Sequence, residues 1–184
     1  MSTLADYTQD EIEKMMAAPM LVSMYVMGTA LSGPVGLVKE MMAGVETAIK
    51  TAQDAAPDSV LHTLFAEDTI KLQQDKLQQE TKESTQGAQN MEEAKAKMLD
   101  DLKTAVGFIA AKGSPAEAAA YRQLMVTVAE NVAHAAKEGG FMGIGGVLVN
   151  DAEKQALDEI SAAVNAPAAA APPASDAAAP AATA

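Results

Sequence analysis

The stretch from residue 15 to residue 38 contains no charged side chain, and this feature most constrains what the chain can fold into. Within it, residues 20–31 are apolar on nearly every side of a helical wheel, with Ser23 and Thr29 as small polar exceptions. A helix without a polar face has to be buried on all sides, in a bundle or in lipid. We therefore expect residues 20–31 to form a central helix, with the other helices packed around it.

The uncharged stretch must also be compared with a membrane-spanning helix, which needs about 20 consecutive apolar residues. Pro19 stands near its start and Ser32-Gly33-Pro34 interrupts it, so the clean apolar helix is only residues 20–31. The charged residues that precede it are mainly acidic, which is the wrong charge for a secretory leader. The sequence thus favours a buried core helix over a membrane segment.

Charge and cysteine content exclude further classes of function. The formal net charge is −12 and Arg122 is the only arginine, whereas nucleic acids and anionic membranes are bound by clusters of Lys and Arg. We expect no nucleic-acid partner. The absence of Cys removes thiol chemistry and fits a reducing compartment, so a cytoplasmic location is the expectation.

Capping signals and apolar periodicity divide the chain into helices. Thr8 and Glu11 form a capping box that starts a helix at Gln9, which should bend or break near Pro19. Further helices are expected over 34–54, from 59 into a polar segment that frays near 84–87, over 91–112, over 115–138, and after Asn150. The predicted fold class is all-α, a compact bundle of about six helices around residues 20–31.

The ends of the chain differ from its middle in composition. Residues 1–7 precede the first capping box, and we expect them to be flexible. The segment from 165 to 184 is rich in Ala and Pro and contains no large apolar residue, so it should be disordered. The helical domain is accordingly predicted to span residues 8–164.

The sequence supplies little for catalysis. It has no Cys, only two His and no nucleophile motif, so no catalytic residue and no cofactor are expected. One alternative is a metal-dependent enzyme, because Asp58 with His62 and Glu130 with His134 are acid–histidine pairs at i and i+4. Such spacing places both groups on one helix face, where ordinary surface pairs are also common. These four residues are the candidate metal ligands.

Methionines form the most suggestive pattern. Four of them follow one another at i, i+4, i+8 and i+11, and two more lie on the next helix. A methionine stripe at helical spacing usually belongs to the hydrophobic core, but flexible thioethers also line surfaces that accept varied partners. The Gly-rich segment 139–149 is either a mobile lid or a packed connector. The candidate binding residues are Met16, Met20, Met24, Met27, Met41, Met42, Phe141 and Ile144.

These observations favour a non-catalytic soluble protein that binds another protein or self-associates through apolar helix surface. A binding module for an apolar small molecule in a Met-lined pocket is the first alternative, and the metal-dependent enzyme is the second.

Overall fold

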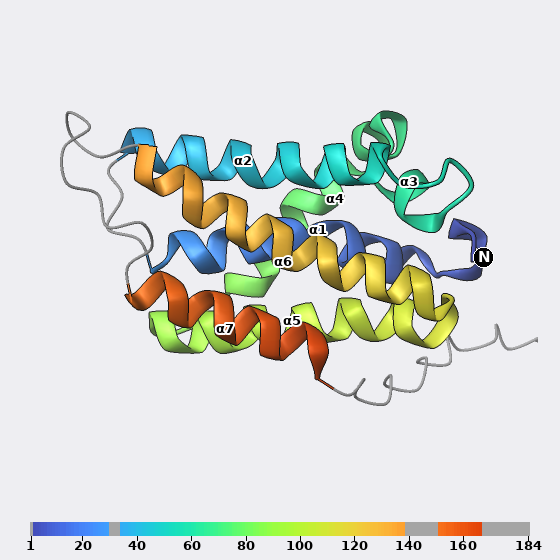
Figure 1. The fold of residues 1–184 in the computed structure, drawn as a ribbon. Coiled ribbons are helices and arrows are strands. Elements are labelled where there is room, and N and C mark those ends of the chain that lie inside the picture. Colours follow the sequence, from blue (N-terminus) through green and yellow to red (C-terminus); the bar gives the residue numbers. More distant parts are fainter. Residues whose placement is uncertain (1, 30–33, 139–150, 167–184) are drawn as a thin grey trace, which may run out of the picture.

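The computed structural model describes residues 2–29, 34–138 and 151–166, and all regular structure in these ranges is helical (Figure 1). The predicted all-α fold class is therefore confirmed for this part of the chain. The Ala/Pro-rich residues 167–184 and the Gly-rich segment 139–150 lie outside the described residues. In chain order the elements are η1 Leu4–Asp6, α1 Gln9–Met27, α2 Pro34–Gln53, α3 Val60–Leu64, α4 Glu67–Thr85, α5 Met91–Lys112, α6 Pro115–Glu138 and α7 Asp151–Asn165.

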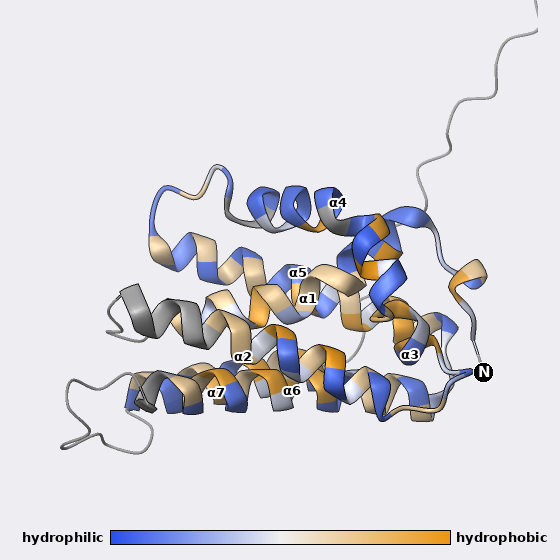
Figure 2. Ribbon diagram, turned by 90° about the horizontal axis from the view of Figure 1, so that it is seen from above, coloured by the Kyte–Doolittle hydropathy of each residue, from blue (hydrophilic) through white to orange (hydrophobic). Residues whose placement is uncertain are grey.

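Helix α1 lies between the other helices, because α2, α4, α5, α6 and α7 all contact it. On one side of α1, α2 packs along α6, and α7 lies against α5 and α6 (Figure 1). Helix α4 lies on the other side of α1, where it also contacts α5 and the short α3. Figure 2 shows that α4 is mostly hydrophilic and lies away from α6 and α7.

Helix α1 continues through Pro19, although the sequence predicted a bend or a break there and a central helix over residues 20–31. Proline has no amide hydrogen, so the carbonyl of Met15, four residues earlier, loses its helical partner. The hydroxyl of Tyr121 in α6 takes that place and donates to the Met15 carbonyl oxygen at 2.7 Å. The predicted start at Gln9 is thus confirmed, whereas the predicted boundary near residue 20 is absent and α1 ends at Met27 instead of residue 31.

Helices α1 and α2 approach closely at Ser23 and Gly44. A Cβ atom built on Gly44 would lie 2.1 Å from the Ser23 Oγ and 3.3 Å from the Val132 Cγ2 in α6. The Ser23 hydroxyl is itself satisfied, because it donates to the Pro19 carbonyl oxygen at 2.8 Å. Glycine at residue 44 therefore allows three helices to meet at one point.

The N-terminal residues were expected to be flexible, and the structure differs. Residues 4–6 form η1, and Ser2 and Tyr7 are each only 6% exposed. The Ser2 amide donates to both carboxylate oxygens of Glu117, at 3.1 and 3.3 Å, and the hydroxyls of Ser2 and Tyr7 are 3.1 Å apart. This segment packs because α6 presents a buried acceptor more than a hundred residues away in the chain.

The polar segment after Ser59 forms two helices, whereas one was predicted. Ser59 caps α3 by accepting from the His62 amide at 3.2 Å. The helix then ends at Leu64, and α4 begins three residues later at Glu67, after an N-cap Ala66 that makes no side-chain cap hydrogen bond. None of the helices in the described residues is long and apolar enough to cross a membrane.

Candidate functional site

An apolar cavity of about 110 Å³ lies where α1, α2 and α4 meet. Its lining is almost entirely hydrocarbon and thioether, and it comes from these three helices and from the residue that follows α3. The lining residues are Met16, Pro19 and Met20 from α1, Val45, Ala48 and Ile49 from α2, Phe65, and Ile70 and Leu77 from α4.

The cavity continues into an exposed apolar strip on α2. Val45 lines the cavity and is 43% exposed, and one turn earlier Met41 and Met42 are 48% and 56% exposed. Residues 41, 45 and 49 follow at intervals of four, so they lie on one flank of the helix. The cavity thus leads along α2 to solvent-exposed methionines.

The floor of this apolar surface is the methionine face of α1. Met24 and Met27 are half-buried and pack against the core, and they share a helix face with Met16 and Met20. Helices α1 and α2 run antiparallel and cross at Ser23 and Gly44 (Figure 1). This register places Met24 and Met27 opposite the turn of α2 that carries the exposed methionines.

Met91, the first residue of α5, marks the far end of the surface. Its sulfur lies 3.7 Å from where a Cβ of Gly28 would be, next to the last turn of α1, and the side chain is 57% exposed. We call the whole surface the methionine groove. It comprises the cavity together with Met24, Met27, Met41, Met42 and Met91.

Helix α4 covers the groove only in part. Its partly buried apolar side chains that pack against the core are Ile70 and Leu77, whereas Gln73 is buried and Leu72 is 81% exposed on another face. The Thr81 hydroxyl lies 2.7 Å from the Leu77 carbonyl oxygen and 3.0 Å from the Met20 sulfur. Helix α4 thus meets the methionine face of α1 at Met16 and Met20, whereas Met24 and Met27 do not line the cavity.

The methionines predicted from the sequence as binding residues therefore fall into three environments. Met16 is 4% exposed and lines the cavity with Met20; Met24 and Met27 are half-buried; Met41 and Met42 are exposed. Phe141 and Ile144, predicted from the Gly-rich segment, lie outside the described residues. Whether these side chains bind a partner stays a prediction.

Sequence reasoning missed the α4 side of the groove and Met91. Leu77 and Ile70 stand in a polar segment that reads as a solvated helix, so no local signal indicates that they face methionines of α1. Val45 and Ile49 were identifiable as part of an apolar helix stripe, but not as the wall of a cavity.

The two acid–histidine pairs are not brought together. Asp58 precedes the N-cap of α3, so it shares no helical turn with His62, and the His62 Nδ1 lies 3.0 Å from the Ala52 carbonyl oxygen near the end of α2. The bond from Asn131 Nδ2 to Thr47 Oγ1, at 2.9 Å, sets the register of α6 against α2. That register places His134 about two helical turns from Ala52, on the order of 12 Å along the axis. No group of three or more His, Asp or Glu side chains suited to a metal occurs among the described residues.

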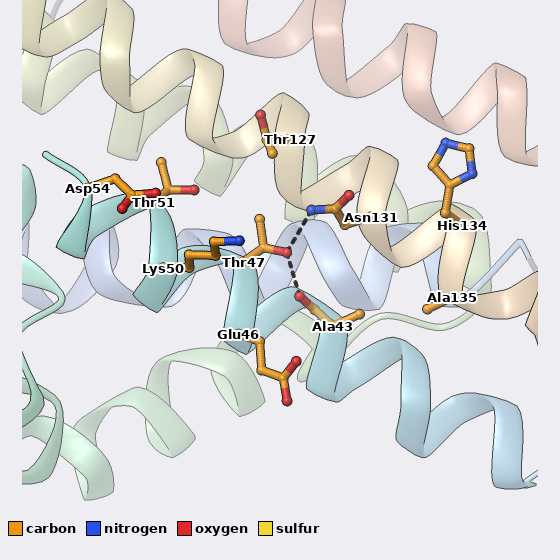
Figure 3. A pocket seen from close by; sticks show the side chains of 10 residues that line it. All are labelled: Ala43, Glu46, Thr47, Lys50, Thr51, Asp54, Thr127, Asn131, His134 and Ala135. Carbon is orange, nitrogen blue, oxygen red and sulfur yellow. Dashed lines mark hydrogen bonds between the residues drawn. The ribbon is translucent and has the colours of Figure 1, made fainter.

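His134 instead lines a polar depression of about 520 Å³ between α2 and α6 (Figure 3). Its ring lies at one end of the depression and Asp54 lies at the other. Between them the Asn131 amide donates to Thr47, and the Thr47 hydroxyl donates to the Ala43 carbonyl oxygen at 2.6 Å. These central polar groups pair with one another rather than converge on a vacant position, so the depression is a weaker candidate than the methionine groove.

The strongly perturbed titratable groups lie outside the groove and have structural partners. Burial raises the pKa of Tyr121, whose hydroxyl bonds to Met15. Burial also raises the pKa of Tyr25, and so does its hydrogen bond to Glu159 in α7. Titratable groups with perturbed pKa values that gather in a cleft are typical of catalytic sites. These two tyrosine hydroxyls instead form hydrogen bonds between helices.

Comparison of the chain with protein-family models, with curated proteins and with solved structures finds no match.

Proposed function

We propose that this chain is a non-catalytic protein that acts by binding another protein in the methionine groove. The observation that carries the proposal is the continuity between the exposed Met41 and Met42 and the apolar cavity below Val45. Large exposed apolar side chains that gather beside a cavity are typical of interaction sites. Methionine suits such a site because its unbranched thioether adapts to different partner surfaces.

The size of the cavity favours a protein partner over a buried small molecule. Ligand pockets usually measure roughly 300–1,000 Å³, so that they enclose most of the ligand. The cavity of about 110 Å³ is too small for that, but it has room for one large apolar side chain. Protein interfaces use such anchor side chains in central pockets, surrounded by flatter contacts. The strip on α2 would supply the flatter contacts.

The groove between helices further suggests the form of the partner segment. An amphipathic helix places apolar side chains at i, i+3 and i+4 into a groove of this kind. One side chain of such a helix would enter the cavity, and its neighbours would lie on the methionines of α1 and α2. A second copy of the chain and a different protein are both covered by this proposal.

Site-specific photo-cross-linking in the host cell tests the proposal. A photoreactive phenylalanine analogue at position 42 should give a discrete cross-linked product, whereas the same analogue at position 72 should not. Leu72 is the matched control because it is 81% exposed and lies on α4 away from the groove. The mass of the product tells a second copy from another protein. Absence of a product at position 42, or equal products at both positions, would contradict the proposal.

A second candidate function is the binding of a small apolar molecule, which the almost wholly apolar lining of the cavity favours. A closed apolar cavity of about 150 Å³ can hold benzene or xenon, so only a compact molecule would fit here. Native mass spectrometry of the protein from its own host tests this candidate. A stoichiometric organic adduct that disappears in Ala48→Phe, which fills the cavity, would support it.

A further inference from the structure

Methionine is placed unevenly in the described part of the molecule. Three methionines lie in the closed core away from the cavity, where Met15, Met98 and Met125 are 0%, 5% and 0% exposed, whereas Met16, buried at 4%, lines the cavity. The other seven described methionines belong to the methionine groove. Of these, Met41, Met42 and Met91 are 48%, 56% and 57% exposed. The three most accessible thioethers of the described residues thus lie on the surface that the proposed function uses.

We propose that Met41, Met42 and Met91 form a modification site at which a hydroperoxide such as hydrogen peroxide oxidises the thioethers and switches the methionine groove from apolar to polar. The biological consequence, loss of partner binding, rests on the proposed function. The order of oxidation and the change in surface polarity depend only on the structure of this chain.

The reaction is balanced without any group beyond the oxidant. The thioether sulfur attacks one peroxide oxygen, the O–O bond breaks, and an S–O bond forms. Each methionine becomes a sulfoxide and each hydrogen peroxide leaves as water. The sulfoxide is polar and chiral, and methionine sulfoxide reductases return it to the thioether. The site can therefore be reset.

Accessibility determines which sulfurs react first. Susceptibility follows exposure to the oxidant, so the three exposed groove methionines should react before the half-buried Met24 and Met27. Core methionines react only when the surrounding structure opens, and local opening of packed helices is rare. We expect Met15 to be oxidised at least about tenfold more slowly than Met42.

Oxidation at these positions should leave the fold in place. The three side chains are roughly half exposed, so a sulfoxide oxygen on each can point to water without displacing a core neighbour. The same oxygen changes the groove directly, because the apolar strip on α2 loses its two largest apolar side chains. The modification thus affects binding while the bundle stays folded.

Peroxide titration of the full chain with peptide mapping by mass spectrometry tests the order of oxidation. Hydrophobic interaction chromatography of the same samples reports the polarity of the surface, and the melting temperature reports the fold. We expect sulfoxide at Met41, Met42 and Met91 first, shorter retention, and an unchanged melting temperature. Treatment with methionine sulfoxide reductases should restore the retention.

The matched control is the variant Met41→Leu, Met42→Leu, Met91→Leu, which keeps the groove apolar and removes the reactive sulfurs. Its retention should not change at peroxide concentrations that shift the unmodified chain. Oxidation of Met15, Met98 and Met125 at rates similar to the exposed three, or equal retention shifts in the chain and the control, would overturn the proposal. Failure to cross-link at position 42 would instead overturn the proposed function and leave the oxidation order as a separate result.

Discussion

The bond between Tyr121 and Met15 offers the sharpest test of how α1 is held together. The Tyr121 hydroxyl donates at 2.7 Å to a carbonyl that Pro19 leaves without its helical partner, and Tyr121 and Met15 are both 0% exposed. Changing Tyr121→Phe removes one oxygen and leaves the ring in place. The carbonyl of Met15 then stays buried without a hydrogen bond.

The magnitude follows from the asymmetry of hydrogen-bond energetics. A typical internal hydrogen bond contributes a net of roughly 0.5–1.5 kcal/mol, but a buried acceptor left unpaired costs roughly 1–3 kcal/mol. The small void where the hydroxyl was adds little, because the ring still fills the site. We therefore expect Tyr121→Phe to lower the free energy of unfolding by about 1–3 kcal/mol.

A double-mutant cycle with Pro19→Ala isolates the cause. Alanine at position 19 restores an amide hydrogen that can reach the Met15 carbonyl within α1. In that background Tyr121→Phe should cost about 1 kcal/mol less than in the unmodified chain, since the carbonyl keeps one partner. Any effect of Pro19→Ala on the unfolded chain cancels in the cycle.

Urea denaturation followed by circular dichroism measures all four proteins of the cycle at pH 7. Equal m values would show that the same surface is exposed on unfolding in each of them. An equal cost of Tyr121→Phe in both backgrounds would refute the reasoning, because the tyrosine would then stabilise the bundle by something other than the carbonyl that Pro19 frees.

Three further predictions concern packing and pH. Met15→Ala should lower the free energy of unfolding by about 2–5 kcal/mol, and Met24→Ala in the half-covered groove by less than half of that. If urea denaturation gives equal losses of unfolding free energy for the two variants, the groove is closed core. Gly44→Ala should cost about 1–3 kcal/mol because its Cβ meets the Ser23 Oγ, and adding Ser23→Ala should recover part of the loss; an unchanged urea midpoint would argue against this contact. Burial alone would raise the pKa of Glu117, but hydrogen bonds with Ser114 and Ser2 lower it from 4.5 to about 2. The lowered pKa contributes at most about 3 kcal/mol to the free energy of unfolding, and this contribution is present above pH 4.5 and lost as the pH falls towards 2. Glu117→Gln should therefore make the free energy of unfolding depend less on pH between 4.5 and 2, and an unchanged slope in this range would be evidence against the prediction.

The starts of most helices in this chain are determined by residues that are close in sequence, so the sequence predicts them well. Thr8 with Glu11, and Asn90 with Glu93, each make the expected capping bonds, and α1 and α5 start directly after them. Each cap depends on residues only three positions apart. The methionine stripe is local in the same sense, because periodicity alone places its members on one face of α1.

The errors arose where a distant residue decides the local structure. Pro19 reads as a helix break until Tyr121 is known to lie against Met15, and residues 2–7 read as loose until Glu117 is known to accept from Ser2. Whether a methionine face is closed core or an open groove is equally non-local. It depends on how much apolar surface the covering helix brings, and nothing near Met20 or Met24 indicates which helix that is.

The polarity of α4 is therefore what separates a groove from a core in this fold. Ile70 and Leu77 of α4 line the cavity with Met16 and Met20. The other buried or half-buried side chains described on α4 are polar, namely Thr69, Gln73, Glu80 and Thr81. The polar residues that made α4 look uninformative in the sequence thus face the bundle as well, and the methionine face of α1 stays half-buried at Met24 and Met27.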